Sequence, residues 1–453
     1  MIKAKPYTLD EALAVAPETR CLRVGRGIVG AAPDLFREHV GQGPALVVGD
    51  VNTFPAAGHA VMEAFQAAGL PVLEPFIFRE RDLHADVVYS EQLESALRGN
   101  TACLVAVGSG CLNDICKYAS HLVQRRYMCV ATAASMDGYT SYGAAMTLKG
   151  GKQTLVCPAP VAVLADVDII RAAPGEMNSW GYADLLAKVP AGADWILADA
   201  LGTEPIHQMG WDIVQGRLRE LLDDPVGVRN RAPDAIGKLI EALLMGGFAM
   251  QVSRSTRAAS GAEHLFSHTW EMQNHTHNGQ MPSHGFKVAV GTMAASALYE
   301  SLLRKPIEQL DVEACCATWP DLQSLMDRAR TLFDGHPAIM EIVNRELSVK
   351  YCDRAQLAVQ LSLVKRIWPE LRNQLREQLP PMETLRHMLV QAGAPTAPEH
   401  IGITRERLRR TYWQASFIRR RITVLDLALR TGFLEDCLDE IFGAGGVWPS
   451  GAK

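Results

Sequence analysis

Short apolar runs alternate with helix-like stretches along the first third of the chain. The runs at 44–49 (PALVVG), 101–107 (TACLVAV) and 127–132 (YMCVAT) have the length and composition of buried strands. Helix-like stretches follow at 55–68 and 111–124. Further candidates are a strand at 70–78 (LPVLEPFIF) and a helix at 89–99 (YSEQLESALRG). Strands that alternate with helices through short links predict a parallel sheet covered by helices on both faces.

Beyond about residue 175 the apolar residues recur at three- and four-residue spacing, which is typical of helices. The clearest segments are 212–223, 234–252, 286–304 and 322–332. The sequence therefore predicts an α/β dinucleotide-binding domain over 1–174. An all-α domain with a C-terminal extension is predicted over 175–453, and the cleft between the two domains is the expected site.

Composition excludes several classes of protein. Lys and Arg number 45 against 50 Asp and Glu, a net charge of −5, whereas general nucleic-acid binders usually carry a basic excess. The arginines at 405–410 and 419–421 are interspersed with apolar residues, and we interpret them as helix surfaces. No uninterrupted run of 18 apolar residues occurs, so no membrane span is expected. The start of the chain lacks the apolar core of a signal peptide, and the ten cysteines form no CxxC pair. These features predict reduced thiols and a cytoplasmic location.

Three polar or glycine-rich segments follow predicted strands. Asp50 ends the first run, Gly108, Ser109 and Gly110 follow the second, and a loop over 132–141 follows the third. Parallel sheets bind ligands at the carboxyl ends of their strands. A Gly-x-Gly turn that opens a helix lets backbone N–H groups approach a pyrophosphate, and Asp50 could accept hydrogen bonds from a ribose. A GSG turn alone is weak evidence, because many tight strand–helix turns bind nothing.

Five histidines fall between 264 and 284. His264 and His268 are four residues apart and share one face of a predicted helix, for which Ser260 and Glu263 suggest a capping box. Imidazole pairs of this kind suit a first-row metal such as Zn²⁺. Asp184, on another predicted helix, offers a carboxylate; the simpler alternative is that it pairs with Lys188 and that the histidines are exposed.

Four segments carry a resemblance to a known family. They are GSGCLNDICKYAS, ATAASMDGYTSYGAA, APGEMNSWGYADLLAK and SGAEHLFSH, in that order. They resemble the blocks of sn-glycerol-1-phosphate dehydrogenases, which include AraM-like bacterial members. This family belongs to the dehydroquinate synthase-like, iron-containing alcohol dehydrogenase superfamily. The resemblance covers about residues 44 to 300 and implies a Rossmann-like N-terminal domain and a helical, metal-binding C-terminal domain.

The resemblance also implies roles for individual residues. Asp184, His264 and His284 are similar to the metal ligands, and His268 and Asp137 to the residues that contact the substrate. The cofactor-binding residues implied are Asp50, Gly108, Ser109, Gly110, Asn113, Asp114, Thr132, Ser135 and Ser141. The family's usual HGEQV is HGFKV here, so His275 and His277 stay open as competitors of His284.

The implied activity is the reversible, metal-dependent reduction of dihydroxyacetone phosphate to sn-glycerol 1-phosphate. NAD(H) is expected to be preferred over NADP(H), because the Asp50 carboxylate would repel a 2′-phosphate. The expected metal is one divalent ion, Zn²⁺, with Ni²⁺ or Fe²⁺ as alternatives. Lys188 is the nearest cation that spacing places beside the metal for the substrate phosphate. A homodimer is left open.

Three other functions remain open at this point. They are a superfamily reductase acting on an unphosphorylated polyol or aldehyde, a dehydroquinate synthase-like cyclase, and a non-catalytic homologue.

Overall fold

A six-stranded, wholly parallel sheet organises the N-terminal part of the protein in the computed structural model, which describes residues 3–80, 83–148 and 151–449. Its strand order is β1-β8-β5-β4-β2-β3. The strands are β1 (Cys21–Gly25), β2 (Ala45–Asp50), β3 (Phe76–Phe78), β4 (Cys103–Gly108), β5 (Met128–Ala131) and β8 (Ala162–Asp166). The predicted parallel sheet is confirmed, whereas β1 and β8 were not predicted and the strand expected over 70–78 shortens to β3.

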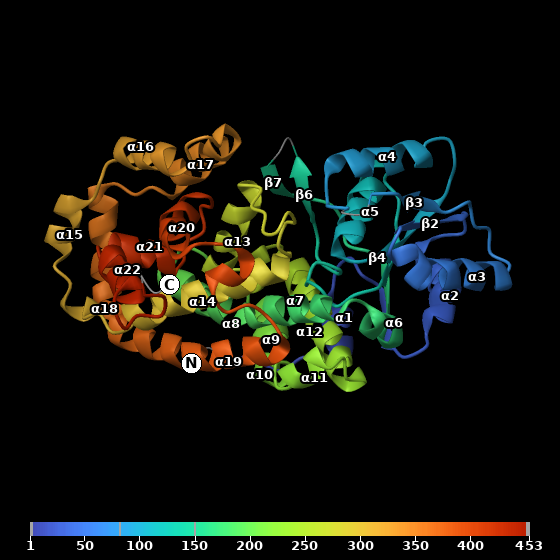
Figure 1. The fold of residues 1–453 in the computed structure, drawn as a ribbon, viewed down its shortest axis with the longest axis horizontal. Coiled ribbons are helices and arrows are strands. Elements are labelled where there is room, and N and C mark those ends of the chain that lie inside the picture. The colour runs from blue at the N-terminus through green and yellow to red at the C-terminus, as the bar shows by residue number, and fades with distance from the viewer. Residues whose placement is uncertain (1–2, 81–82, 149–150, 450–453) are drawn as a thin grey trace.

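Alternate residues of the strands point to opposite faces of the sheet, and each face is covered by helices. Leu46 and Leu104 belong to a core with residues of α4 and α5, whereas Val47 and Val105 belong to a second core with residues of α2 and α3. Figure 1 shows these helices on either side of the sheet. The helices are α1 (Leu9–Val15), α2 (Ala32–Leu35), α3 (His59–Ala67), α4 (Val87–Leu97), α5 (Gly110–Leu122) and α6 (Val167–Ala172).

A two-stranded antiparallel hairpin, which the sequence did not predict, interrupts the alternation. It consists of β6 (Ala144–Leu148) and β7 (Gly151–Leu155) and stands between the sheet and the helical half (Figure 1). Strand β7 contacts α13 (Ala262–Met272), so the hairpin reaches the helix that carries the predicted metal ligand His264.

Beyond the sheet the described chain is helical. The helices are α7 (Gly175–Leu186), α8 (Lys188–Ala200), α9 (Gln208–Gln215), α10 (Leu218–Leu221), α11 (Pro225–Arg229), α12 (Pro233–Ser253), α13 (Ala262–Met272), α14 (His284–Leu302), α15 (Val312–Thr318), α16 (Leu322–Leu332), α17 (Pro337–Lys350), α18 (Arg354–Gln378), α19 (Met382–Ala392), α20 (Arg405–Phe417), α21 (Val424–Arg430) and α22 (Leu434–Phe442). The helix predicted over 212–223 is broken between α9 and α10. The predicted combination of α/β and helical parts is confirmed, and the boundary at 174 stays a prediction.

Close packing of α7, α13 and α14 forms the centre of the helical part. A Cβ atom on Gly291 of α14 would lie 2.2 Å from the Glu263 carbonyl oxygen of α13. A Cβ on Gly285 would lie 2.2 Å from the Trp180 carbonyl oxygen of α7. These two glycines therefore allow α14 to approach both neighbouring helices.

Helix α12 bears on the expectation that the chain has no membrane span, which stays a prediction. It is long and apolar enough to cross a membrane by length and composition, although no uninterrupted apolar run of 18 residues exists. Most of its apolar window is buried inside the protein, where α12 packs against α7, α9 and α11, as a core helix does.

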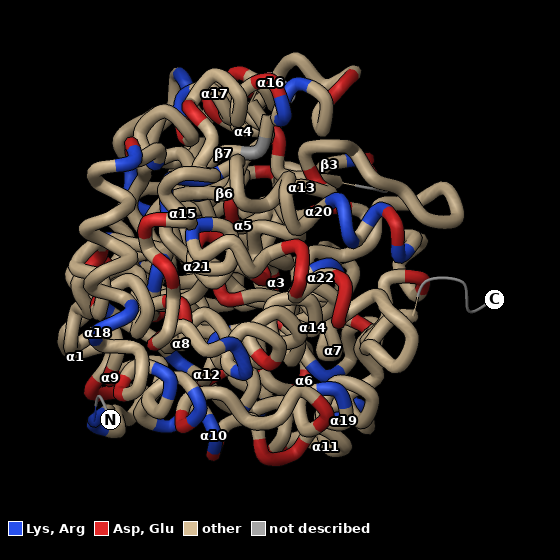
Figure 2. The backbone as a smooth tube through the Cα atoms, turned by 90° about the vertical axis from the view of Figure 1, so that its left-hand side faces the viewer, with Lys and Arg blue, Asp and Glu red and all other residues tan. Residues whose placement is uncertain are grey.

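Charged residues of both signs are interspersed along the backbone in Figure 2. All ten cysteines are free, as predicted.

Candidate functional site: a metal cluster facing a dinucleotide groove

Asp184, His264 and His284 come together from three helices. Asp184 lies in the last turn of α7, His264 in the first turn of α13, and His284 is the first residue of α14. One ligand atom from each residue lies within 4.8 Å of the other two. The His264 Nε2 is 3.3 Å from the Asp184 Oδ1, and both side chains are buried, whereas His284 is partly exposed. Two imidazoles and one carboxylate are a donor set that suits a divalent first-row metal.

Two glutamates, which the sequence analysis did not include in the site, orient the histidines. The Glu263 Oε1 lies 2.8 Å from the His264 Nδ1. Glu271 binds two rings, with its Oε1 2.9 Å from the His284 Nδ1 and its Oε2 3.2 Å from the His268 Nδ1. Carboxylates that hold Nδ1 leave each Nε2 free to bind a metal or a substrate. The sequence signal was the position of Glu271, three residues after His268 on one helix.

The start of α13 differs from the predicted capping box. Gly261 is the N-cap, and the Ser260 hydroxyl donates instead to the Thr256 carbonyl oxygen. The Glu263 Oε1 accepts a hydrogen bond from the Gly261 N–H at 2.6 Å as well as contacting His264. One carboxylate therefore fixes both the beginning of the helix and the orientation of His264.

Buried charge around the ligands supports a divalent cation. Four carboxylates belong to the ligand set or lie within ion-pair distance of it or of its neighbours. Only two ammonium groups lie among them. The carboxylates are Asp137, Asp184, Glu263 and Glu271, and the ammonium groups are Lys188 and Lys287. The carboxylates outnumber the ammonium groups, and the remaining buried negative charge is costly unless a protonated imidazole or a bound cation balances it. The residues present therefore fit a divalent metal ion.

The pKa values of these groups reflect burial opposed by close charges. Burial alone would raise the pKa of Asp184, but Lys188 and His264 hold it well below its usual range. Burial acts to lower the pKa of His264, and the Asp184 and Glu263 carboxylates instead raise it to about 9. Burial lowers the pKa of His268 to about 4, against the opposing effect of Glu271. His268 is therefore neutral at physiological pH.

Lys188 lies beside the predicted metal ligand Asp184, as spacing indicated. Its ammonium group already forms ion pairs with two carboxylates. Its Nζ lies 2.7 Å from the Asp137 Oδ2 and 3.4 Å from the Asp184 Oδ1, and its side chain is fully buried. Burial would lower the pKa of the ammonium group, but Asp137 and Asp184 raise it. Lys188 therefore positions these carboxylates and is not free to bind a substrate phosphate, which corrects the expectation from spacing.

The glycine-rich turn lies between β4 and α5, at the carboxyl edge of the sheet. A Cβ on Gly108 would come within 2.4 Å of the Leu112 side chain, and one on Gly110 within 2.7 Å of Met136. Ser109 is the N-cap of α5, and its side chain makes no capping hydrogen bond. The first N–H groups of α5 therefore lack a side-chain cap, and such a helix start attracts a phosphate.

Asp50 ends the neighbouring strand β2 and lines the same cleft. Its Oδ1 accepts hydrogen bonds from the N–H groups of Asn52 at 2.8 Å and Thr53 at 2.7 Å. These bonds hold the carboxyl group in one orientation. Among the described residues no hydrogen bond to its Oδ2 occurs, so this oxygen is available to a ribose.

The remaining predicted cofactor residues divide into two groups. Asp114, Thr132, Ser135 and Ser141 line the cleft. Asn113 does not, because its side chain accepts from the Tyr127 hydroxyl at 3.1 Å and donates to the Tyr139 carbonyl oxygen at 3.3 Å. It supports the loop that precedes the hairpin, and its role as a cofactor contact stays a prediction.

Lys117 was missed by the sequence analysis, although it fixes this loop. Its buried Nζ donates to the carbonyl oxygens of Gly138 and Gly143, both at 3.0 Å, and to the Ser141 hydroxyl at 3.3 Å. Asp114 accepts from the same group at 3.3 Å. The Asp114–Lys117 spacing of three residues on one helix was the available signal.

One cleft of about 2530 Å³ joins the sheet edge to the histidines. It is lined by Asp50, the 109–111 turn, Asp137, His264, His268 and His284. His277 also lines it, whereas His275 does not, since its Nε2 contacts the Ile401 carbonyl oxygen and its Nδ1 contacts Arg407, both at 2.7 Å. His275 is therefore engaged elsewhere, and among the described residues the cluster contains His284 and neither competitor.

The chain is similar to known dehydrogenases in sequence and in fold. The family model described as iron-containing alcohol dehydrogenase matches residues 23–174. A glycerol-1-phosphate dehydrogenase (NAD(P)+) from Halalkalibacterium halodurans is 33% identical over 321 residues, which are 68% of this chain and 80% of the relative. The corresponding protein of Geobacillus thermodenitrificans is 30% identical over 322 residues, 71% of this chain and 70% of the relative.

Solved structures extend the likeness to almost the whole chain. The glycerol dehydrogenase of Schizosaccharomyces pombe superimposes with a TM-score of 0.60 at 15% identity, covering 96% of this chain and 92% of that one. A probable glycerol dehydrogenase from Sinorhizobium meliloti gives a TM-score of 0.58 at 17% identity, covering 96% and 100%. At these identities the likeness shows the fold alone. The identity and coverage of the two curated relatives show more: the chain belongs to the glycerol-1-phosphate dehydrogenase family, among the iron-containing alcohol dehydrogenases.

Proposed function

We propose that the protein reduces dihydroxyacetone phosphate to sn-glycerol 1-phosphate, reversibly, with a nicotinamide cofactor and one divalent metal ion. The observation that carries the proposal is one continuous cleft, which joins a helix start suited to a pyrophosphate to the Asp184–His264–His284 cluster. The curated relatives with this activity in their names support the choice of substrate.

The metal would be held by Asp184, His264 and His284. When bound, it supplies Lewis acidity that polarises the substrate carbonyl, and the reduced nicotinamide supplies the hydride. Glu263 and Glu271 hold the imidazoles with Nε2 toward the cleft. Lys188 helps to keep Asp184 ionised although it is buried. Burial and the Asp184 charge raise the pKa of Asp137, and Lys188 opposes that rise.

His268 would orient the substrate. Its Nδ1 lies 3.2 Å from the Glu271 carboxylate, and its low pKa keeps the ring neutral. A neutral ring that donates through Nδ1 presents Nε2 as an acceptor. His268 therefore accepts a hydrogen bond from the substrate's free hydroxyl, and the proton needed for reduction comes from water in the open cleft. Asp137, which donates its backbone N–H to the Asp184 Oδ2 at 3.0 Å, lines the same wall.

Three finer points belong to the proposal. NAD(H) should be preferred over NADP(H), because the Asp50 carboxylate at the end of β2 would face a 2′-phosphate. Zn²⁺ is the metal we favour, since two imidazoles and one carboxylate are a common zinc donor set. The cytoplasm is the expected location.

The test follows NADH oxidation by absorbance with dihydroxyacetone phosphate and with unphosphorylated dihydroxyacetone. A phosphate contact of about 1.4 kcal/mol should give the phosphorylated ketone at least about tenfold higher kcat/KM. Equal reduction of the two ketones would favour instead a reductase of unphosphorylated polyols. No reduction of either ketone by metal-loaded protein would favour a non-redox role.

A further inference from the structure

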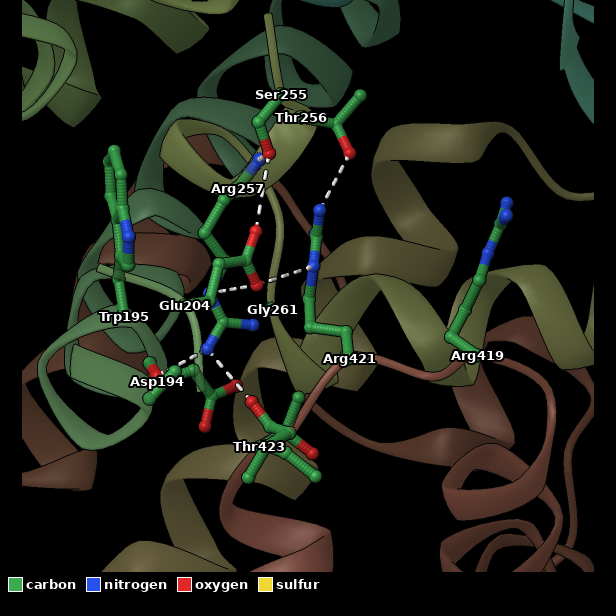
Figure 3. Close-up of polar contacts among 12 residues, drawn as sticks. Asp194, Trp195, Glu204, Ser255, Thr256, Arg257, Gly261, Arg419, Arg421 and Thr423 are labelled. Atoms are coloured by element: carbon green, nitrogen blue, oxygen red, sulfur yellow. Dashed lines mark hydrogen bonds and ion pairs between the residues drawn. The ribbon is translucent and has the colours of Figure 1, made fainter. Parts of the chain in front are cut away.

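Three consecutive arginines, Arg419 to Arg421, line the cleft from the side opposite the sheet. They follow α20 and lie far from the family blocks in the sequence, where they were interpreted as helix surfaces. Arg421 and Arg419 in Figure 3 extend from the same loop near the start of α13. The C-terminal segment therefore contributes positive charge to a cleft that also contains the predicted cofactor and metal residues between 50 and 284.

Two of the three arginines already have partners. The Arg421 guanidinium donates to the Ser260 carbonyl oxygen at 2.8 Å and to the Thr256 hydroxyl at 3.0 Å. Arg420 forms a two-pronged pair with Glu346 at 2.9 and 3.0 Å. These contacts hold the two residues that directly follow Arg419 in the loop.

Arg419 has no such partner. Among the described residues its guanidinium makes no hydrogen bond or ion pair, whereas its main-chain carbonyl oxygen accepts from the Lys350 Nζ at 3.1 Å. Figure 3 draws no contact from this guanidinium to the other residues shown, among them the paired Arg421. Burial lowers the pKa of Arg419, with Glu346 opposing, but an arginine stays protonated in proteins. A partly desolvated cation that lacks a partner costs free energy, and an anionic ligand would recover it.

A side pocket lies between Arg419 and the candidate metal cluster. This pocket of about 120 Å³ is lined by Arg419, His268, Arg345 and the hairpin residues Gln153 and Thr154. Its polar groups include two guanidinium groups, an amide and a hydroxyl, which can all donate to phosphate oxygens. The His268 ring centre lies 6.0 Å from those of His264 and His284, so His268 separates the side pocket from the ligands.

We propose that Arg419 binds the phosphate group of the substrate in this side pocket. The inference rests on the proposed function, because it assumes a phosphorylated three-carbon ketone. In that ketone three covalent bonds separate the phosphorus from the carbonyl carbon. A phosphate beside Arg419 would therefore keep the carbonyl on the far side of His268, toward the metal ligands.

Other cations near the ligands are already engaged. Lys188 is held by Asp137 and Asp184, and Lys287 lies 3.1 Å from the Glu271 Oε1. Arg419 is the cation lining the cleft near His268 that the described contacts leave unpaired. A guanidinium also matches phosphate geometry, since it can donate two parallel hydrogen bonds. The C-terminal segment thus determines substrate specificity at a site whose chemistry lies elsewhere in the chain.

The experiment measures kcat/KM for dihydroxyacetone phosphate and for dihydroxyacetone in three proteins: wild type, Arg419→Gln and Arg410→Gln. Arg410 is exposed on α20, outside the cleft, so its variant removes the same charge without reaching the site. Arg419→Gln should lower kcat/KM for the phosphorylated ketone at least about tenfold, because charge-assisted phosphate contacts are lost. Efficiency with dihydroxyacetone should not change, and inhibition by inorganic phosphate should weaken in Arg419→Gln alone.

The outcomes separate this inference from the proposed function. If wild type prefers the phosphorylated ketone and Arg419→Gln keeps that preference, the inference is wrong and the proposed function stands. If wild type shows no preference, both are wrong. NADH binding and metal content equal to wild type would show that Arg419→Gln is folded. If it does not fold, Arg419→Lys carries the test, since lysine keeps the charge and loses the two-pronged geometry. Unchanged selectivity in Arg419→Lys would then count against the inference.

Discussion

Replacing Glu271 with glutamine tests whether this carboxylate, rather than the ligands alone, determines metal affinity. Glu271 contacts the Nδ1 atoms of His268 and His284 and the ammonium group of Lys287. Burial alone would raise its pKa, but Lys287 and the imidazoles hold it well below its usual range, so it is ionised. The Glu271→Gln variant keeps the shape of the side chain but removes the charge that orients both rings.

Two effects of Glu271→Gln can be separated. Loss of a carboxylate behind a ligating histidine lowers metal affinity by about 10- to 100-fold. Lys287, only 2% exposed, would also lose its counter-ion, and breaking a buried pair costs roughly 3–5 kcal/mol of stability. Adding Lys287→Met removes the stranded charge, so the double variant should melt at a higher temperature than Glu271→Gln. Metal affinity should not recover in the double variant.

The assay is a titration of chelator-treated protein with Zn²⁺ against a competing chromophoric chelator, together with melting curves. Wild-type affinity in Glu271→Gln would refute the reasoning, because the ligands would then need no carboxylate behind them. Recovery of affinity in the double variant would refute it differently, by showing that the stranded lysine charge caused the loss.

Other substitutions and conditions test the remaining parts of the site. Asp184→Asn should abolish turnover and lower metal content while NADH binding persists, and wild-type metal content would remove Asp184 from the ligand set. Asp50→Gly should narrow the preference for NADH over NADPH, measured as the ratio of kcat/KM values; equal efficiencies in wild type would contradict this placement. The apparent metal affinity should fall about tenfold for each pH unit below about 9, because the metal competes with a proton on His264, and should level off above that pH. A pH-independent affinity would contradict that competition. Gly291→Ala should lower the melting temperature, since overpacking of α13 against α14 costs about 1–3 kcal/mol.

Local patterns were sufficient to predict the central strands of the sheet. β2, β4 and β5 are continuous apolar runs because both of their faces are buried, and such runs are recognisable from composition. Strand β1 is an edge strand of five residues with an exposed Arg23, so it lacks this pattern. The hairpin β6–β7 was missed as well, since its strands pair with one another outside the sheet.

The candidate metal cluster differs from the one that spacing alone suggests. His264 and His268 share a helix face, and spacing alone would place both on the metal. In the structure the third position belongs to His284, which starts the next helix. Only the family resemblance favoured His284 over His268 as a metal ligand. The choice between them depends on how α14 approaches α13 at Gly291. That approach joins residues distant in sequence, and no local pattern encodes it.

The position of the arginines at 419–421 in the cleft could not be predicted from local sequence either. Charged residues interspersed with apolar ones are usually part of a helix surface. The sequence alone predicts that location, because it does not show tertiary contacts. Their role depends on α20 packing against α13, a contact between segments more than a hundred residues apart. Lys188, which spacing favoured for the phosphate, is held instead by the buried carboxylates of Asp137 and Asp184. Lys188 lies close in sequence to Asp184 and pairs with the buried acids. The cation that we propose for the phosphate, Arg419, comes instead from a segment distant in sequence from these acids.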